Sequence, residues 1–583
     1  MSEKTRNIKQ SSLVQLMLGV LIIILVNIIG AYIFTRIDLT AEKRYSLSDQ
    51  TKQILMELDD IVYFQVYLEG DFPAGFKRLR NATREMLDEF RAYSSNIEYK
   101  FINPSGSEDP EENNRTYNLL VERGLSPTDL QVKTSEGVSK KIIFPGAIAS
   151  YRGEEKAVEL LRSQMGISSE EVLNNSIQAL EFNLANTIKQ LTTEKRKRVA
   201  FIEGHGELSA VETADISRAL KEYYSVDRLE LNQQLNSLTE RNPIDSMKTA
   251  IRNKYDAIII AKPVGAFSEK DKFIIDQFIM RGGKVLWLLD PITTSMDSLQ
   301  NSGATIGVTK DMNLEDMLFK YGVRLNHNLV QDLNAMPIPL TTGSIAGQPQ
   351  VEFYPWYYFP VITPTSDHPI VKNLNAIKTE FISSLDTIGI PTVRKTILLK
   401  TSPYSRTVNA PVYINLNMLQ KEPDERLYNK PPQPVAVLLE GMFPSLFARR
   451  IPPEIQTSKD IGFLTQTEKE NRMIIMSDGD IIRNQLHYSQ GYPLPLGYDQ
   501  YTRETFGNKE LILNSMNYLT DGPGLISIRS RDIKLRLLDM NKVNENKLFW
   551  QLLNVMAPIL LILISGILIL WFRKRKYTRN HTK

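Results

Sequence analysis

The chain has 583 residues, a formal net charge of +3 and no cysteine. Without cysteine it has no disulfide framework, no thiolate nucleophile and no cysteine-based zinc site. Lys and Arg concentrate at the two ends of the chain, so the positive balance gives no case for nucleic-acid binding, and we expect no nucleic-acid partner. The sequence also lacks a Walker A loop, which excludes an ATPase of the P-loop kind. It contains neither a Gly-x-Ser-x-Gly elbow nor a Gly-x-Gly-x-x-Gly fingerprint.

Two uncharged apolar segments, residues 13–34 and 548–572, lie near the ends of the chain. A helix rises about 1.5 Å per residue, so each segment is long enough to span the roughly 30 Å hydrocarbon core of a bilayer. A cleaved signal peptide is the alternative for the first segment, but the bulky residues 32–34 stand where a small-residue cleavage site is expected. We therefore predict two transmembrane helices, and Asn27 of the first is a candidate for hydrogen bonding to a neighbouring helix.

The orientation follows from the basic tail at residues 573–583, which contains several Lys and Arg and no acid. An excess of positive charge marks the cytoplasmic side of a membrane helix, so this tail is predicted to be cytoplasmic. With two spans, the N-terminal tail at residues 1–12 is cytoplasmic as well. We predict a two-pass protein of the bacterial cytoplasmic (inner) membrane whose bulk is periplasmic, and the lack of cysteine suits such an oxidising space.

Residues 35–195 are expected to form a first extracytoplasmic α/β domain. Ser48 is the predicted N-cap of its first helix. The order of strand, helix and strand that follows predicts a mostly parallel sheet. Strands are expected at 62–68, 97–102, 130–132 and 141–151, and helices at 76–93 and 168–191.

Residues 196–547 are expected to form a second extracytoplasmic α/β domain, with an inserted region at about 292–430. Three strand–helix repeats in its first part predict a doubly wound, mainly parallel sheet. Strands are expected at 199–202, 255–261, 284–289, 435–439 and 473–476, and helices ending near Leu220, at 269–280 and at 509–519.

The first candidate site is the segment Glu203-Gly204-His205-Gly206-Glu207, directly after a predicted strand. Open α/β sheets bind ligands at this end of their strands, and the glycines would let a ligand approach the backbone. A metal or acid–base site would need partners. The candidate partners, which follow other predicted strands, are Asp290, Asp478 and Asp480. The alternative, which we favour, is a tight turn whose acids stabilise a helix N-terminus.

The second candidate site is the aromatic run at residues 354–360, which includes Trp356 and Tyr357. It would stack on sugar rings or form a partner hot spot, because Trp and Tyr concentrate binding energy. Packing beneath a loop is the interpretation that we favour. The segment Asp478-Gly479-Asp480 resembles a cation-binding turn but lacks the further spaced ligands of a calcium loop, so a simple turn is favoured there too.

Several short segments, in this order between the two apolar ends, carry a resemblance to a known family. They are RYSLS at 44–48, FIEGHGE at 201–207, HPI at 368–370, FISS at 381–384, LLKTS at 398–402 and GN at 507–508. Together they resemble the GldG family of gliding-motility proteins, which are ABC-transporter auxiliary proteins.

This resemblance implies a non-enzymatic auxiliary, substrate-binding subunit that works with a separate ABC ATPase and an ABC-2-type permease in gliding motility. Other envelope or gliding-machinery proteins are further candidate partners. The second domain would be similar to a flavodoxin-like or glutamine-amidotransferase-like sheet, but the chain has no cysteine to serve as an amidotransferase nucleophile. No catalytic residue, metal or cofactor is implied.

Two other functions stay open at this point. One is a membrane-anchored extracytoplasmic hydrolase or carbohydrate-binding protein, which would use the sheet edge near His205 and the aromatic run. The other is a purely structural envelope anchor, which predicts that no transporter subunits accompany the chain.

Overall fold

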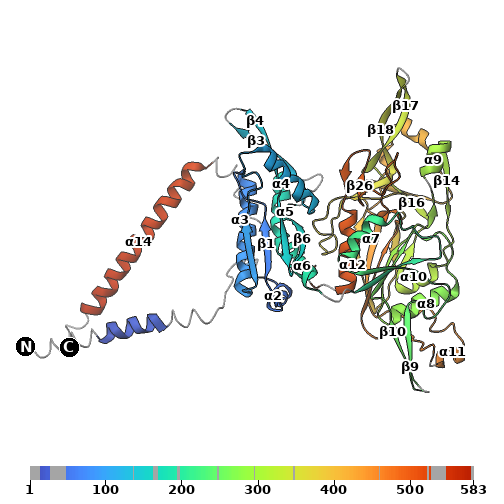
Figure 1. Ribbon diagram of the computed structural model, residues 1–583, viewed down its shortest axis with the longest axis horizontal. Coiled ribbons are helices and arrows are strands. Elements are labelled where there is room, and N and C mark those ends of the chain that lie inside the picture. The colour runs from blue at the N-terminus through green and yellow to red at the C-terminus, as the bar shows by residue number, and fades with distance from the viewer. Residues whose placement is uncertain are drawn as a thin grey trace, which may run out of the picture. The chain divides into compact units, whose positions relative to one another are not determined.

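The computed structural model (Figure 1) describes these residues: 14–25, 47–134, 137–161, 168–193, 197–245, 248–294, 296–345, 348–458, 460–521, 524, 526 and 546–578. The chain divides into two compact units, Met1–Arg531 and Asp532–Lys583, and each is described by itself. Several predicted features lie outside the described residues, among them the N-terminal tail 1–12, Asn27 and the end of the basic tail, 579–583.

Helix α14 (Lys547–Thr578) contains the predicted C-terminal transmembrane segment. Its part Lys547–Arg575 has 29 residues, and none of its most apolar stretch is buried against the protein. This length is enough to span a bilayer. The apolar helix Val14–Leu25 is shorter, and residues 26–34 of the predicted first span lie outside the described part of the chain. The two-span arrangement therefore stays a prediction.

The first sheet has the strand order β2-β1-β5-β6 and is mixed. Its strands are β1 (Val62–Val66), β2 (Ile97–Phe101), β5 (Gly146–Tyr151) and β6 (Glu154–Glu159). Only β1 and β2 are parallel, so the expectation of a mostly parallel sheet here is wrong. The reason is local: Arg152 and Gly153 have positive φ angles of 48° and 86°, and this tight turn makes β5 and β6 antiparallel neighbours.

Helices cover both faces of this first sheet. They are α2 (Asp49–Met56), α3 (Ala74–Tyr93), α4 (Pro110–Glu122), α5 (Ser169–Gln178) and α6 (Leu180–Thr192). Ser48 caps α2 as predicted, because its hydroxyl accepts a hydrogen bond from the Thr51 N–H at 3.1 Å. The helix expected at 168–191 is two helices, separated at Ala179. The hairpin of β3 (Thr128–Thr134) and β4 (Gly137–Ile143) precedes β5.

The second sheet has seven strands in the order β21-β24-β25-β12-β11-β7-β8. The strands from β25 to β8 are parallel, whereas β24 and β21 add to one side in antiparallel fashion. The bounds are β7 (Arg198–Glu203), β8 (Ser225–Glu230), β11 (Ala257–Ala261), β12 (Lys284–Leu288), β21 (Val393–Lys400), β24 (Pro434–Gly441) and β25 (Asn471–Met476). The predicted strands near 199–202, 255–261, 284–289, 435–439 and 473–476 are confirmed.

Helices also cover both faces of the second sheet. Successive residues of β11 show this: Ile259 belongs to one core cluster with Ile216 and Leu511, and Ile258 to another with Phe278 and Leu318. The first cluster involves α7 (Ala214–Lys221) and α12 (Asn508–Asp521), and the second involves α8 (Glu269–Met280) and α10 (Glu315–Tyr321). The sheet is therefore the middle layer of three, as a doubly wound arrangement requires.

The remaining elements are short, except for one long hairpin formed by β17 (Ala335–Ile345) and β18 (Gln348–Ile362). Strand β21 lies within residues 292–430, so part of the region predicted as an insertion contributes to the main sheet. The other strands are β9 (Thr239–Asp245), β10 (Lys248–Asn253), β13 (Ile292–Thr293), β14 (Ala304–Thr309), β15 (Val323–Leu325), β16 (Asn328–Asp332), β19 (Ile377–Lys378), β20 (Leu385–Thr387), β22 (Ser405–Asn409), β23 (Val412–Asn415), β26 (Tyr498–Asp499) and β27 (Glu504–Thr505). The other helices are α9 (Met296–Ser302), α11 (Pro453–Thr457), η1 (Leu416–Gln420), η2 (Glu425–Leu427) and η3 (Asp480–Ile482).

Candidate functional site

His205 lies directly after β7, at the carboxyl end of the parallel strands, and is almost completely buried. Its Nδ1 lies 3.2 Å from Glu207 Oε1, and its Nε2 lies 3.4 Å from Asp271 Oδ2 on α8. Its ring stacks on Phe267 with a centroid distance of 3.7 Å. The two ring nitrogens are thus engaged by carboxylates within the protein.

Glu203 turns away from His205 and pairs with Arg228 of β8. Arg228 also donates hydrogen bonds to the Thr213 hydroxyl at 2.9 Å and to the Leu208 carbonyl at 2.6 Å. Gly204 with a φ of 111° forms the turn that separates the two side chains. Glu203 and His205 therefore contact different partners, and their role as a shared ligand surface stays a prediction.

The charges around His205 decide its protonation. Burial on its own lowers the pKa of His205, but the hydrogen bond to Glu207 and the negative charges of Glu207 and Asp271 outweigh burial and raise the pKa above its ordinary value of 6.5. When it is protonated, His205 ties the turn after β7 to α8 through its two carboxylate partners.

A second group of charges joins the ends of β11, β12 and β25. It contains Asp290, Asp478 and Asp480, the candidate partners of His205, but the carboxylates that His205 contacts belong to Glu207 and Asp271 instead. Lys262, which follows β11, forms ion pairs with Asp480 and, at 3.3 Å, with Asp290 Oδ2. Asp290 Oδ1 accepts a hydrogen bond from the Gly479 N–H at 2.5 Å. Lys262 was not singled out in the sequence analysis. The signal available in the sequence was a lysine placed between a buried strand and Pro263. In the structure its backbone has a φ of 54°.

Asp478 is completely buried within this second group. Its carboxylate accepts hydrogen bonds from the Asp480 N–H at 2.8 Å and the Glu380 N–H at 3.1 Å. Burial and the neighbouring Asp290 raise the pKa of Asp478 well above its ordinary value, and burial likewise raises the pKa of Asp290. Among the residues that the structure describes, no group of three or more His, Asp or Glu side chains could hold a metal ion.

Three residues of the aromatic run, Trp356, Tyr358 and Phe359, lie in a separate hydrophobic cluster. Trp356 has no exposed surface and Tyr357 is only 8% exposed. The Trp356 ring packs against Tyr358 at a centroid distance of 5.4 Å, and Tyr357 packs against Tyr428 at 6.0 Å. In this arrangement neither ring is open to solvent, and a ligand role for them stays a prediction.

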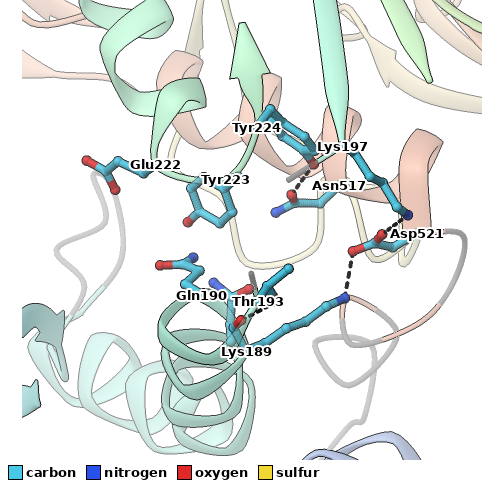
Figure 2. Close-up of a pocket in the computed structure, with 10 residues that line it drawn as sticks. Lys189, Gln190, Thr193, Lys197, Glu222, Tyr223, Tyr224, Asn517 and Asp521 are labelled. Carbon is cyan, nitrogen blue, oxygen red and sulfur yellow. Dashed lines mark hydrogen bonds and ion pairs between the residues drawn. The ribbon is translucent and has the colours of Figure 1, made fainter. Parts of the chain in front are cut away.

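A cavity of about 100 Å³ lies where α6 meets the start of β7 and the end of α12 (Figure 2). Figure 2 shows Lys189 of α6 and Lys197 both reaching the carboxylate of Asp521, the last residue of α12. Lys189 Nζ lies 2.7 Å from Asp521 Oδ2, and Lys197 also forms an ion pair with Asp521. The cavity is lined by Asn186, Lys189, Gln190, Thr193, Lys197, Glu222, Tyr223, Tyr224, Asn517 and Asp521.

The position of Asp521 explains why two lysines gather there. A carboxylate at a helix C-terminus is unfavourable beside the negative end of the helix dipole, so it needs compensating cations. Lys197 compensates the charge of Asp521, and it also donates a hydrogen bond to the Thr520 carbonyl, at 2.8 Å, near the C-terminal end of the helix. Burial raises the pKa of Asp521, but the hydrogen bonds and charges of Lys189 and Lys197 outweigh burial and lower the pKa below its ordinary value of 3.8. We call these three side chains the junction cluster.

The raised pKa of His205 predicts a pH-dependent contribution to stability. A group with a raised folded-state pKa stabilises the fold fully below its unfolded pKa, and this contribution is lost as the pH rises through the folded pKa. We therefore expect His205→Gln to lower the melting temperature of the full chain in detergent most at about pH 6 and least at about pH 9. Buried Trp287 and Trp356 provide the fluorescence signal. A difference that stays constant across this pH range would contradict the prediction.

The junction cluster predicts local loosening when its central charge is removed. Asp521→Asn keeps the shape of the side chain but removes both ion pairs, and hydrogen bonds to charged groups contribute about 1.5 kcal/mol each. We expect amide hydrogen exchange at the C-terminal end of α6 to accelerate roughly tenfold. Glu510→Gln, at an exposed acid on the same helix, is the matched control. Equal exchange in the two variants would mean that the cluster does not hold α6.

Comparison with known proteins gives two family matches. A family profile described as ABC-type uncharacterized transport system matches residues 196–515, and a domain of unknown function (DUF7088) matches residues 41–150. An uncharacterized protein of Borreliella burgdorferi is 23% identical over 579 residues, which cover 97% of this chain and 99% of that protein. Among solved structures, the mmIFT52 N-terminal domain matches with a TM-score of 0.30 and 12% identity, over 55% of this chain and 97% of that one.

Proposed function

The chain belongs to the family described as ABC-type uncharacterized transport system, and we propose that it is a membrane-anchored, non-enzymatic auxiliary subunit of such a transporter. The observation that carries the proposal is the family match, which covers all strands of the second sheet, combined with the unburied apolar helix α14. A transport-system component with an anchor of this kind works beside membrane partners. The finer proposal is a GldG-type subunit for gliding motility, with a separate ATPase, an ABC-2-type permease and a periplasmic bulk.

The state of the charges at the sheet edge supports a non-enzymatic role. His205 is held by Glu207 and Asp271, and Lys262 is held by Asp290 and Asp480. A catalytic acid, base or nucleophile has to reach its substrate, whereas these side chains are largely buried and bound to one another. We propose that the edge stabilises the fold, and that the subunit acts through its surfaces and its anchor.

The order of the parallel strands supports a flavodoxin-like second domain. In chain order the five parallel strands are β7, β8, β11, β12 and β25, and in the sheet they lie as 2-1-3-4-5. This is the order found in flavodoxin-like sheets. The proposed domains remain 35–195 and 196–547, with the junction cluster between α6 and α12 close to that boundary.

The junction cluster also suggests how motion would pass along the chain. Asp521 ends α12, and the chain then continues toward α14. In the proposed orientation ATP is hydrolysed on the opposite side of the membrane from the folded domains. Coupling would therefore pass through the membrane helices or through contact with the permease, and the junction cluster ties α6 to the end of α12.

Co-purification tests the auxiliary-subunit proposal. When the tagged full chain is extracted gently in detergent from its native membrane, we expect a polytopic permease and a P-loop ATPase to be recovered in stoichiometric amounts, as identified by mass spectrometry. Untagged membranes processed in parallel are the control. Recovery of the chain alone, or only with envelope proteins, would overturn the proposal.

Single cysteines test the proposed orientation, since the natural chain has none to interfere. Tyr488 is 79% exposed and lies in the folded part, and Tyr577 lies in the basic tail. In intact cells we expect a membrane-impermeant maleimide to label Tyr488→Cys but not Tyr577→Cys. Both should react after the membrane is permeabilised, which controls for thiol reactivity. Labelling of Tyr577→Cys in intact cells would refute the orientation.

A further inference from the structure

The long hairpin β17–β18 has an unusual composition for this chain. Residues 333–351 contain no charged side chain, although 23% of the whole chain is charged. The base of the hairpin is buried, with Met336, Ile338 and Trp356 in a hydrophobic cluster. Figure 1 shows the hairpin extending from this base beyond the neighbouring strands. Solvated hairpins and edge strands normally carry charged side chains that oppose association. This hairpin lacks that protection over residues 333–351.

One face of this hairpin is apolar and open. The cross-strand pairs Pro337 with Pro355, Pro339 with Phe353, and Thr341 with Val351 alternate with pairs on the opposite face. Phe353 is 52% exposed and Val351 is 49% exposed. We call these six side chains the hairpin face.

Glu352, which lies between Val351 and Phe353 in the sequence, is directed away from the hairpin face. Glu352 pairs with Leu340 on the opposite side of the ladder. Its carboxylate accepts hydrogen bonds from the Tyr354 hydroxyl at 2.7 Å and from the Gln350 amide at 2.9 Å. The six side chains of the hairpin face carry no charge themselves, and the acid between Val351 and Phe353 in the sequence is held on the opposite side of the ladder.

We infer that the hairpin face docks onto a protein partner whose own surface is apolar and uncharged. Interface cores are depleted of charge and enriched in aromatic anchors, which matches a charge-free face centred on Phe353. A charged partner surface would lose its hydration against this face with no ion pair in return.

The other modes of contact fit the hairpin less well. Prolines at positions 337 and 339 of β17 and at 349 and 355 of β18 remove backbone donors, which opposes the addition of a partner strand at the edges. A two-stranded hairpin with open edges would leave backbone groups unpaired in hydrocarbon. Residues 333–351 also offer no Lys or Arg to lipid headgroups. Packing of the face against protein avoids each of these costs.

The test uses the full chain in its native membrane with a single introduced cysteine that carries a photoreactive benzophenone. Val351→Cys and Phe353→Cys place the probe on the hairpin face, and Glu352→Cys places it on the opposite face of the same strand. We expect the two face positions, but not position 352, to form an adduct with one protein other than this chain. Mass spectrometry should map the attachment to an apolar, uncharged segment of that protein.

A second substitution tests the apolar nature of the contact. Adding Phe353→Asp to the Val351→Cys probe should reduce the adduct roughly tenfold, because a carboxylate cannot be buried in an apolar contact. Adducts with lipid, adducts with a second copy of this chain, equal labelling from position 352, or no adduct would each overturn the inference. The inference is independent of the transport assignment: a partner that is no transporter component would leave the docking face intact and count against the proposed function.

Discussion

A parallel sheet must be covered on both faces, and the architecture around the seven-stranded sheet follows from this requirement. Strand β11 is buried along its whole length, so neither of its faces can meet water. Helices α7 and α12 cover one face, and α8 and α10 cover the other. The connections between the parallel strands carry the chain back to the edge where the strands begin, so the parallel strands all end at the opposite edge. This is why Glu203, Lys262 and Asp290 all lie at the carboxyl ends of their strands.

Concentrating charge at a buried edge is costly unless the charges compensate one another, and here they do. Lys262 lies between two aspartates, and His205 lies between Glu207 and Asp271. A lone buried charge would be strongly unfavourable, whereas paired charges with further hydrogen bonds are tolerated. In such sheets this edge often binds a ligand. Here its ion pairs join the ends of neighbouring strands.

Local patterns made much of the fold predictable, and long-range pairing accounts for the rest. The apolar run at 257–261 and the hydroxyl of Ser48 are local signals, and both predictions are confirmed. By contrast, the antiparallel strand β21 pairs with β24 through residues that are distant in sequence. Glu203 and His205 were grouped because they are two residues apart, but their partners Arg228 and Asp271 come from other elements. No sequence pattern fixed those partners.

The junction cluster and the hairpin face depend on opposite physical forces. Asp521 is held by two lysines, and ion pairs at partly exposed sites weaken as salt screens them. The hairpin face has no charge to screen, and apolar burial is not weakened by moderate salt. An increase in ionic strength would therefore weaken the ion pairs that hold α6, whereas the proposed docking at Phe353 would not be weakened. The junction cluster therefore depends on charge, whereas the proposed docking of the hairpin face would depend on apolar burial.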